Sequence, residues 1–307
     1  MAAIEIRSVT KQFGSLTAVH DLTLDVPEGS IYGFIGPNGS GKTTTIRMIM
    51  NILLPDRGEI LVFDRHSHSS VRDDVGYLPE ERGLYKRMTV RRVLRYYGQL
   101  KGRPLSDIDA AITDWLKRLD LYDWIDKKIT ALSKGMAQKV QFIAAVVSRP
   151  KLVILDEPFS GLDPVNADAL RDAVLALRRT GTTVVFSTHD MSAAERLCDR
   201  IFMIFKGNKV LDGTLDDIQS HYGQDTVRVR TRAGATALAG MPEVESVNDA
   251  GNVQDVRLKG DAQAFLHRLS QQTDVYHFEL TKPSLHDIFV RIARPTAAEL
   301  APEVSRA

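Results

Sequence analysis

Residues 36–43 fit the pattern G-x-x-x-x-G-K-[S/T] and read Gly36-Pro37-Asn38-Gly39-Ser40-Gly41-Lys42-Thr43. The apolar run before them, Ile31–Ile35, is typical of a buried strand, and the spacing after them predicts a helix over Gly41–Leu54. A glycine-rich loop in this position lets backbone N–H groups and the helix N-terminus point at one anion. The segment therefore predicts a nucleoside triphosphate site, in which Lys42 neutralises the phosphates and the Thr43 hydroxyl binds Mg²⁺.

Strand-like and helical stretches alternate outward from this loop as far as about residue 220. Val153–Leu155 and Thr183–Ser187 are apolar or β-branched runs, as expected of parallel strands that are buried on both faces. Ala167–Arg178, which lies between them, has apolar residues at helical spacing. This alternation predicts an α/β sheet with helices on both sides.

The middle of the chain departs from this alternation. Residues from Thr89 to Val147 show helical spacing and no convincing strand, so a helical subdomain is expected at about 86–148. Ser106 is followed three residues later by Asp109, which resembles a capping pair at the start of a helix. We therefore expect this subdomain to be inserted into the α/β domain.

The C-terminal part has a third pattern. After about Gly223, strands and helices follow the order β-α-β-β-α-β, which predicts a small ferredoxin-like α+β accessory domain. A short helix is expected at Ala235–Leu238, Asp261 is expected to open the next helix, and Ser284 and Asp287 are expected to cap a last helix. The predicted domains are 1–222, 223–294 and a flexible tail at 295–307.

Acidic residues and a histidine follow two of the expected strands. Leu152–Leu155 is an apolar run that leads into Asp156 and Glu157. At the carboxyl edge of an open α/β sheet, Asp156 is expected to hold Mg²⁺ and Glu157 to activate the attacking water. His189 ends another strand at that edge, where its imidazole could contact the γ-phosphate or the water. The alternatives are an acid pair that caps a turn and a structural histidine, and the phosphate-binding loop favours catalysis.

The charge balance, cysteine count and hydropathy of the chain argue against several classes of protein. The 307 residues carry 40 Lys and Arg against 39 Asp and Glu, so a general attraction to nucleic acid is not expected. The one cysteine, Cys198, cannot form an internal disulfide, which is typical of a reducing compartment. The sequence offers no run near the roughly 18 apolar residues of a membrane helix, and its start has no apolar signal core. We expect a cytoplasmic chain that meets a membrane only through a partner.

Two more segments point to a family. Leu132-Ser133-Lys134-Gly135-Met136 precedes a helix, and Ser160-Gly161-Leu162-Asp163 follows the acidic pair. In this order and spacing, the motifs of residues 3–220 resemble the ATP-binding cassette of ABC transporters. The resemblance implies a P-loop NTPase fold, with a RecA-like core and a helical subdomain, and an ATPase that uses ATP and Mg²⁺.

The resemblance also implies roles for individual residues. Phe13 sits where the family places an aromatic ring that stacks on adenine. Further ATP contacts are implied at Val19, Gly36, Pro37, Asn38, Gly39, Ser40, Gly41, Lys42, Thr43 and Thr44. In the family's head-to-tail dimer, the signature segment of one subunit closes the ATP site of the other. This implies contacts in trans from Ser133, Lys134, Gly135 and Met136, with Asp163 at the dimer seam.

Two departures from the family pattern concern the same site. Glu80 follows Gly76-Tyr77-Leu78-Pro79, where the family usually has a glutamine that contacts Mg²⁺ or water, so Glu80 is a third expected metal contact. The signature has Lys134 and Met136 at its third and fifth places. Because a carboxylate near the γ-phosphate is repulsive without a compensating cation, we hypothesise that Lys134 of the opposite subunit balances Glu80. The alternative is that both side chains point to solvent.

These variants resemble a branch of ABC-2-type exporters that includes sodium-extrusion systems, which share the run Pro79-Glu80-Glu81-Arg82-Gly83-Leu84. The resemblance implies an ATP-hydrolysing subunit that forms a homodimer or a heterodimer and drives export, of sodium or a drug, through a separate membrane permease. It would lie on the cytoplasmic face of the membrane. The alternative is a soluble ABC-type ATPase that acts on a ribosomal or nucleic-acid complex, but such chains usually carry two cassettes or a long coiled coil. A small-molecule kinase would lack the signature.

Overall fold

The computed structural model describes residues 1–66, 73–81, 83–222 and 225–293. Contacts between residues divide the chain into two compact units, of which the first is Met1–Leu215 and the second begins at Asp216. Arg82 and the flexible tail predicted at 295–307 lie outside the described residues. No helix in the described ranges combines the length and the apolar character that crossing a membrane requires.

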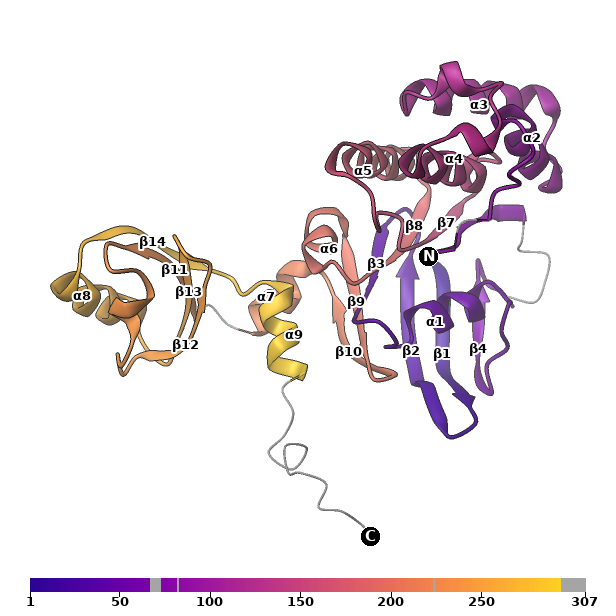
Figure 1. Cartoon of the computed structure of the whole chain (residues 1–307). Helices are drawn as coiled ribbons and strands as arrows, with labels where there is room; N and C mark the ends of the chain where they lie inside the picture. Colours follow the sequence, from indigo (N-terminus) through magenta and orange to yellow (C-terminus); the bar gives the residue numbers. More distant parts are fainter. Residues whose placement is uncertain (67–72, 82, 223–224, 294–307) are drawn as a thin grey trace, which may run out of the picture. The chain divides into compact units, whose positions relative to one another are not determined.

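A six-stranded sheet in the order β10-β9-β3-β8-β7-β6 forms the centre of the first unit (Figure 1). Five strands are parallel and β10 pairs antiparallel with β9 at one edge. Because β3, β7 and β8 are buried along their whole length, the prediction of a parallel sheet covered on both faces is confirmed. The six strands are β3 (Ile31–Ile35), β6 (Val75–Leu78), β7 (Leu152–Asp156), β8 (Thr183–Thr188), β9 (Arg200–Phe205) and β10 (Asn208–Gly213).

One face of this sheet packs against α1 and a second, antiparallel sheet in the order β2-β1-β4-β5, and all of them share one hydrophobic core. Helix α1 (Lys42–Ile49) is shorter than predicted. It ends because Asn51 is left-handed (φ 52°), and the N–H groups of Ile52 and Leu53 turn back to the Arg47 carbonyl. The antiparallel strands are β1 (Ala2–Phe13), β2 (Leu16–Pro27), β4 (Arg57–Val62) and β5 (Arg65–His66).

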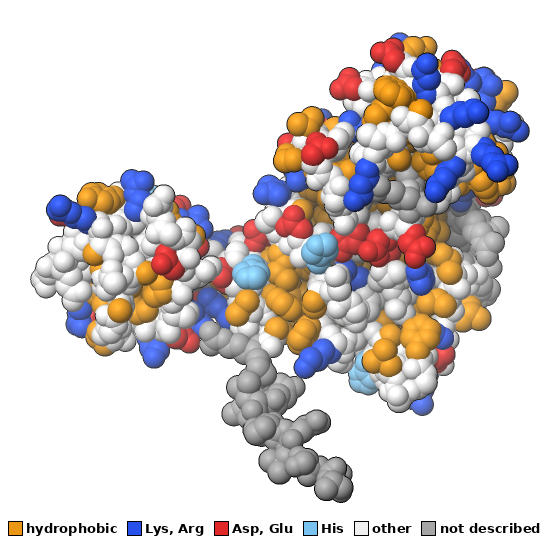
Figure 2. Space-filling view, in the orientation of Figure 1, with side chains coloured by type: hydrophobic (Ala, Val, Ile, Leu, Met, Phe, Trp, Pro, Cys, Tyr) orange, Lys and Arg blue, Asp and Glu red, His pale blue; other side chains and the backbone are white. Residues whose placement is uncertain are grey.

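Helices cover the other face of the parallel sheet and share a second hydrophobic core with it. This confirms the expected helical subdomain. Its elements are α2 (Val90–Leu100), α3 (Leu105–Arg118), η2 (Tyr122–Trp124), η3 (Ile129–Ala131) and α4 (Lys134–Val146), and they are followed by α5 (Pro164–Arg179) and α6 (Met191–Leu197). Figure 2 shows Lys and Arg side chains gathered over α2 and α3 on the visible face.

One prediction within this subdomain is wrong. Ser106 and Asp109 do not cap α3, because the helix begins at Leu105, after Pro104, whose φ of −58° already suits a helix start. The Asp109 carboxylate instead accepts two hydrogen bonds of 2.7 Å from the guanidinium of Arg95 on α2. Asp109 therefore joins two helices rather than closing the end of one.

The second unit has a four-stranded antiparallel sheet in the order β12-β13-β11-β14, which is the predicted ferredoxin-like arrangement. The predicted caps are confirmed. Asp261 accepts from the Ala264 N–H at 2.9 Å, and Ser284 and Asp287 bond reciprocally to each other's N–H at 3.1 Å. Its elements are α7 (Leu215–His221), β11 (Thr226–Thr231), η4 (Gly234–Leu238), β12 (Val244–Asp249), β13 (Gln254–Leu258), α8 (Ala262–Gln272), β14 (Val275–Thr281) and α9 (Leu285–Ala293).

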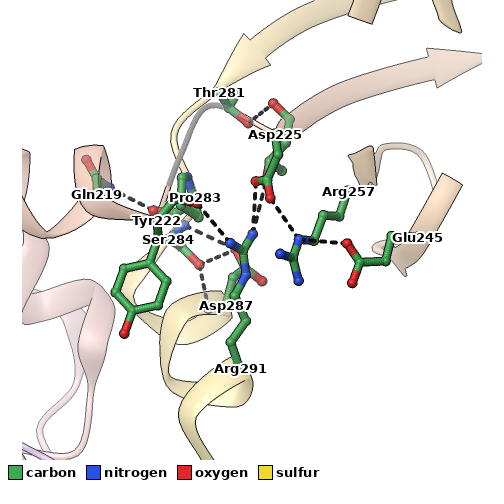
Figure 3. A network of polar contacts seen from close by, with 11 residues as sticks. Gln219, Tyr222, Asp225, Glu245, Arg257, Thr281, Pro283, Ser284, Asp287 and Arg291 are labelled. Atoms are coloured by element: carbon green, nitrogen blue, oxygen red, sulfur yellow. Dashed lines mark hydrogen bonds and ion pairs between the residues drawn. The ribbon is translucent and has the colours of Figure 1, made fainter. Parts of the chain in front are cut away.

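A chain of ion pairs joins α9 to the sheet of the second unit (Figure 3). Arg291 donates to the Tyr222 carbonyl and to Asp225, at 3.2 Å each. Asp225 also accepts from Arg257 at 2.8 Å, and Arg257 lies 3.2 Å from Glu245. Burial raises the pKa of Asp225, but the bond from Arg257 and the charge of Arg291 outweigh it and hold that pKa below its usual value.

Candidate functional site

The loop of residues 36–43 lies between the carboxyl end of β3 and the start of α1, as predicted. Two of its glycines are required by close packing. A Cβ on Gly36 (φ 151°) would lie 2.3 Å from the Ile204 carbonyl oxygen, and a Cβ on Gly41 (φ 115°) would lie 2.5 Å from the Ala18 carbonyl oxygen. The loop can therefore keep this path, with its backbone open to an anion, only with glycine at these two positions.

The ammonium group of Lys42 lies inside this loop. Its Nζ donates to the carbonyl oxygens of Gly36, at 2.7 Å, and Pro37, at 3.1 Å, and lies 3.9 Å from Glu157 Oε1. Burial lowers the pKa of Lys42, and the nearby carboxylates act against that effect. Ser40 Oγ is also buried and finds no partner among the described residues. A buried cation and an unpaired hydroxyl are suited to an anionic ligand.

Asp156 is the last residue of β7, and its two carboxylate oxygens differ in their hydrogen bonds. Its Oδ1 accepts from Ser187 Oγ at 2.5 Å and from Thr43 Oγ1 at 3.4 Å. Its Oδ2 is buried without a partner in the described part of the chain. Because an unpaired buried carboxylate oxygen is costly, and because Mg²⁺ prefers oxygen ligands, Asp156 and Thr43 fit the predicted metal site.

Glu157, the next residue, is buried and contacts His189. Its backbone is left-handed (φ 50°), a strained conformation for a residue other than glycine, and its N–H donates to Ser187 Oγ at 3.0 Å. Glu157 Oε1 lies 3.0 Å from His189 Nδ1. The His189 side chain, just beyond β8, is 55% exposed. The structure thus brings together the carboxylate predicted to activate water and an imidazole that solvent can reach.

A recess of about 620 Å³ is lined by Lys42, Thr43 and Glu157 and extends to an aromatic ring at the end of β1. That ring belongs to Phe13, which is 47% exposed and has Lys11 Nζ 5.5 Å from its centroid. Val19 does not line the recess, because its side chain is fully buried in the core. Its expected contact with ATP stays a prediction. The recess is lined by Phe13, Leu16, Thr17, Ala18, Asn38, Gly39, Gly41, Lys42, Thr43, Thr44, Glu80, Glu157, Lys206 and Gly207.

The signature residues lie at the start of α4, outside the residues that line this recess. Ser133 Oγ caps the helix by accepting from the Met136 N–H at 3.3 Å. Lys134 Nζ lies beside Gly161, where an added Cβ would be 3.0 Å away.

Gly135 and Asp163 share a neighbour on α5. A Cβ added to Gly135 would lie 2.7 Å from Asn166 Nδ2. Asp163 caps α5 by accepting from the Asn166 N–H at 3.0 Å, and this bond helps to hold the pKa of Asp163 below its usual value. The signature segment and residues 160–163 are therefore next to each other in one chain.

Ser187 is part of this site and was not predicted. It is completely buried at the end of β8, where it donates to Asp156 and accepts from the Glu157 N–H. The sequence signal that could have indicated Ser187 was a polar residue at the end of an apolar strand. That strand ends at the sheet edge that was already expected to bind ligand. Ser187 holds both carboxylate-bearing residues in place.

Known proteins resemble this chain in both units. The ABC transporter family matches residues 19–160, and the C-terminal domain of DrrA1-3-like ATP-binding proteins matches residues 213–293. The ABC transporter ATP-binding protein YhaQ of Bacillus subtilis is 39% identical over 94% of this chain and 97% of its own length. The Nod factor export ATP-binding protein I of Bradyrhizobium diazoefficiens is 35% identical over 74% of this chain and 76% of its own. A solved ATP-binding subunit of an ABC transporter superposes with a TM-score of 0.68 and 31% identity, over 72% of this chain and 93% of that one.

Proposed function

This chain belongs to the ABC transporter family of ATP-binding proteins, and from that membership we propose that it hydrolyses ATP in the recess between Phe13 and Glu157. The observation that carries the proposal is the grouping of four side chains at one sheet edge. Lys42 is buried in the phosphate-binding loop, Asp156 has an unpaired oxygen, and Glu157 contacts His189. A phosphate-binding cation, a metal ligand and a base are the groups that phosphoryl transfer to water requires.

Each group has a defined task in this proposal. The Phe13 ring stacks on adenine, and the Lys42 ammonium exchanges its loop carbonyls for phosphate oxygens. Mg²⁺ neutralises charge on the phosphates when it is bound, and Thr43, Asp156 and Glu80 are the residues that would hold it. Glu157 accepts a proton from the attacking water while the water oxygen bonds to the γ-phosphorus and the bond to ADP breaks. His189 orients the Glu157 carboxylate through the 3.0 Å contact.

Dimerisation completes the site in this proposal. Ser133, Lys134, Gly135 and Met136 lie outside the recess of their own chain, which is consistent with a contact to ATP held by a second subunit. That subunit is another copy of this chain or a related ATP-binding protein, and Asp163 would lie at the seam. Glu80 lines the recess, where Lys134 of the second subunit would balance its charge.

We further propose that the dimer lies on the cytoplasmic face of the membrane and drives export through a separate membrane permease. A relative named for Nod factor export supports export. Sodium or a drug is the cargo that we propose, from the resemblance of residues 79–84 to sodium-extrusion systems and to exporters of the same branch. We propose residues 1–222 as the cassette and 223–294 as the accessory domain, which places α7 with the cassette, whereas the contacts between residues place the division after Leu215. No nucleic-acid partner is proposed.

The test is co-purification after expression in cells, followed by ATPase and transport assays with the captured membrane protein. The proposal expects a multi-span protein to be captured and Mg²⁺-dependent ATPase activity that Glu157→Gln abolishes. Capture of ribosomes or nucleic acid in its place would refute the transport assignment.

A further inference from the structure

Helix α4, which starts with the signature residues, also carries two buried glutamines that contact the acidic loops of the same chain. Gln141 Nε2 donates to the carbonyl oxygens of both Pro79 and Glu81, at 3.2 Å each. Gln138 Nε2, almost one turn earlier, donates to the Pro158 carbonyl oxygen at 3.2 Å. We call Gln138 and Gln141 the glutamine bracket. We propose that they are positioning residues, which fix Glu80 and Glu157 in the ATP site, and this proposal rests on the proposed ATPase function.

The contact of Gln141 depends on the donors of its amide group. Gln141 is 6% exposed, and the two carbonyl groups that it contacts can only accept hydrogen bonds, so its NH₂ group must face them. Its Oε1 is buried without a partner among the described residues, which is a cost that an apolar side chain would avoid. The two donors of the amide hold the carbonyl groups of the residues before and after Glu80, just beyond the end of β6.

Gln138 acts in the same way on the second loop. Glu157 has a left-handed backbone, a conformation that persists only where its surroundings enforce it. On one side, the Glu157 N–H is bonded to Ser187 Oγ, and on the other, the Pro158 carbonyl is bonded to Gln138, which is 3% exposed. The chain on both sides of Glu157 is thus fixed, and one face of α4 holds both acidic loops.

The bracket predicts a specific kinetic defect. Within the described part of the chain, no side-chain hydrogen bond joins Gln138 or Gln141 to Phe13, Lys42 or the phosphate-binding loop, so loss of the bracket should leave ATP affinity unchanged. It should displace Glu80 as a metal contact and so weaken metal binding and lower kcat. Residues that orient metal ligands typically contribute about 10- to 100-fold to metal affinity or activity.

The decisive variant is Gln141→Glu, which keeps the shape and turns a carboxylate oxygen toward two carbonyl oxygens. We expect kcat to fall about tenfold with KM for ATP changed less than about twofold. In the presence of AMP-PNP, Mn²⁺ affinity measured by EPR should fall by a similar factor. The matched control is Gln99→Glu on the exposed side of α2, which should leave both quantities unchanged.

A double-mutant cycle distinguishes a positioning role of Gln141 toward Glu80 from a general loss of structure. If Gln141 acts through Glu80, Gln141→Glu should have no further effect on Mn²⁺ affinity in a Glu80→Ala background, whereas additive losses would overturn the proposal. If Gln141→Glu does not fold, Gln141→Met, which keeps the length and removes the donors, takes its place. Wild-type kcat and Mn²⁺ affinity in a folded variant would also overturn it. A wild-type chain that binds AMP-PNP but never hydrolyses ATP would refute the ATPase function alone, because the Mn²⁺ measurement needs no turnover.

Discussion

Replacing Phe13 by alanine should weaken ATP binding without weakening the fold. The ring is 47% exposed at the end of β1 and lines the recess opposite the phosphate-binding loop. Stacking of a base on an aromatic side chain contributes about 1–3 kcal/mol, which corresponds to a Kd raised by roughly 5- to 150-fold. Because about half of Phe13 already faces solvent, and its ring has a lysine, Lys11, beside it rather than core residues, the thermal midpoint should hardly change.

The assay is isothermal titration of Mg²⁺–ATP into the wild-type chain, Phe13→Ala and Phe13→Tyr, with thermal unfolding of each alone. Phe13→Tyr keeps a π-face and should bind ATP within about twofold of wild type, since stacking requires only the ring. A Phe13→Ala variant that binds ATP as tightly as wild type would refute the assignment of the ring to adenine. A large fall in its thermal midpoint would show that Phe13 is a core residue instead.

Three other substitutions test separate parts of the account. Lys42→Ala should abolish binding of a fluorescent ATP analogue, because it removes the ammonium group buried within the loop; unchanged binding would contradict the loop assignment. Asp225→Asn should lower stability by about 2 kcal/mol at pH 7 in urea titrations, since it weakens bonds to two arginines. Because the pKa of Asp225 is lower in the folded chain than its usual 3.8, the stability that Asp225 contributes is present above pH 3.8 and is lost as the pH falls through the pKa of the folded chain. A difference in stability between wild type and Asp225→Asn that persisted below that pKa would refute the ion-pair explanation. Phe265→Ala, at a fully buried position, should destabilise the second unit by about 3–5 kcal/mol in calorimetry and leave ATP affinity unchanged. A parallel loss of ATP binding would contradict the assignment of the ATP site to the first unit alone.

The geometry of the candidate ATP site was largely predictable because its parts are local in sequence. The loop at 36–43 needs glycine where the backbone passes close to Ile204 and Ala18, and this requirement is visible as a motif. The two acids follow an apolar strand directly, so the edge of the sheet on which they lie could be inferred from topology.

Sequence patterns say less where tertiary contacts decide the outcome. Val19 belongs to a strand whose sequence does not reveal which face is buried, and its side chain lies in the core. Asp109 was assigned to a local cap, but the guanidinium of Arg95 on another helix is the better partner. Ser187 and Gln141 escaped prediction because their partners are far away along the chain, and no short motif records such contacts.

If Glu157 activates water in an ATP-bound dimer, Glu157→Gln should separate dimer formation from hydrolysis. The measurement is size-exclusion chromatography with light scattering in Mg²⁺–ATP, combined with phosphate release from the same sample. We expect no phosphate release and a stable dimer that forms only with ATP, because the neutral amide cannot accept the proton of the water while the other ATP contacts remain. Phosphate release at the wild-type rate, or a Glu157→Gln chain that binds ATP but stays monomeric, would contradict this expectation.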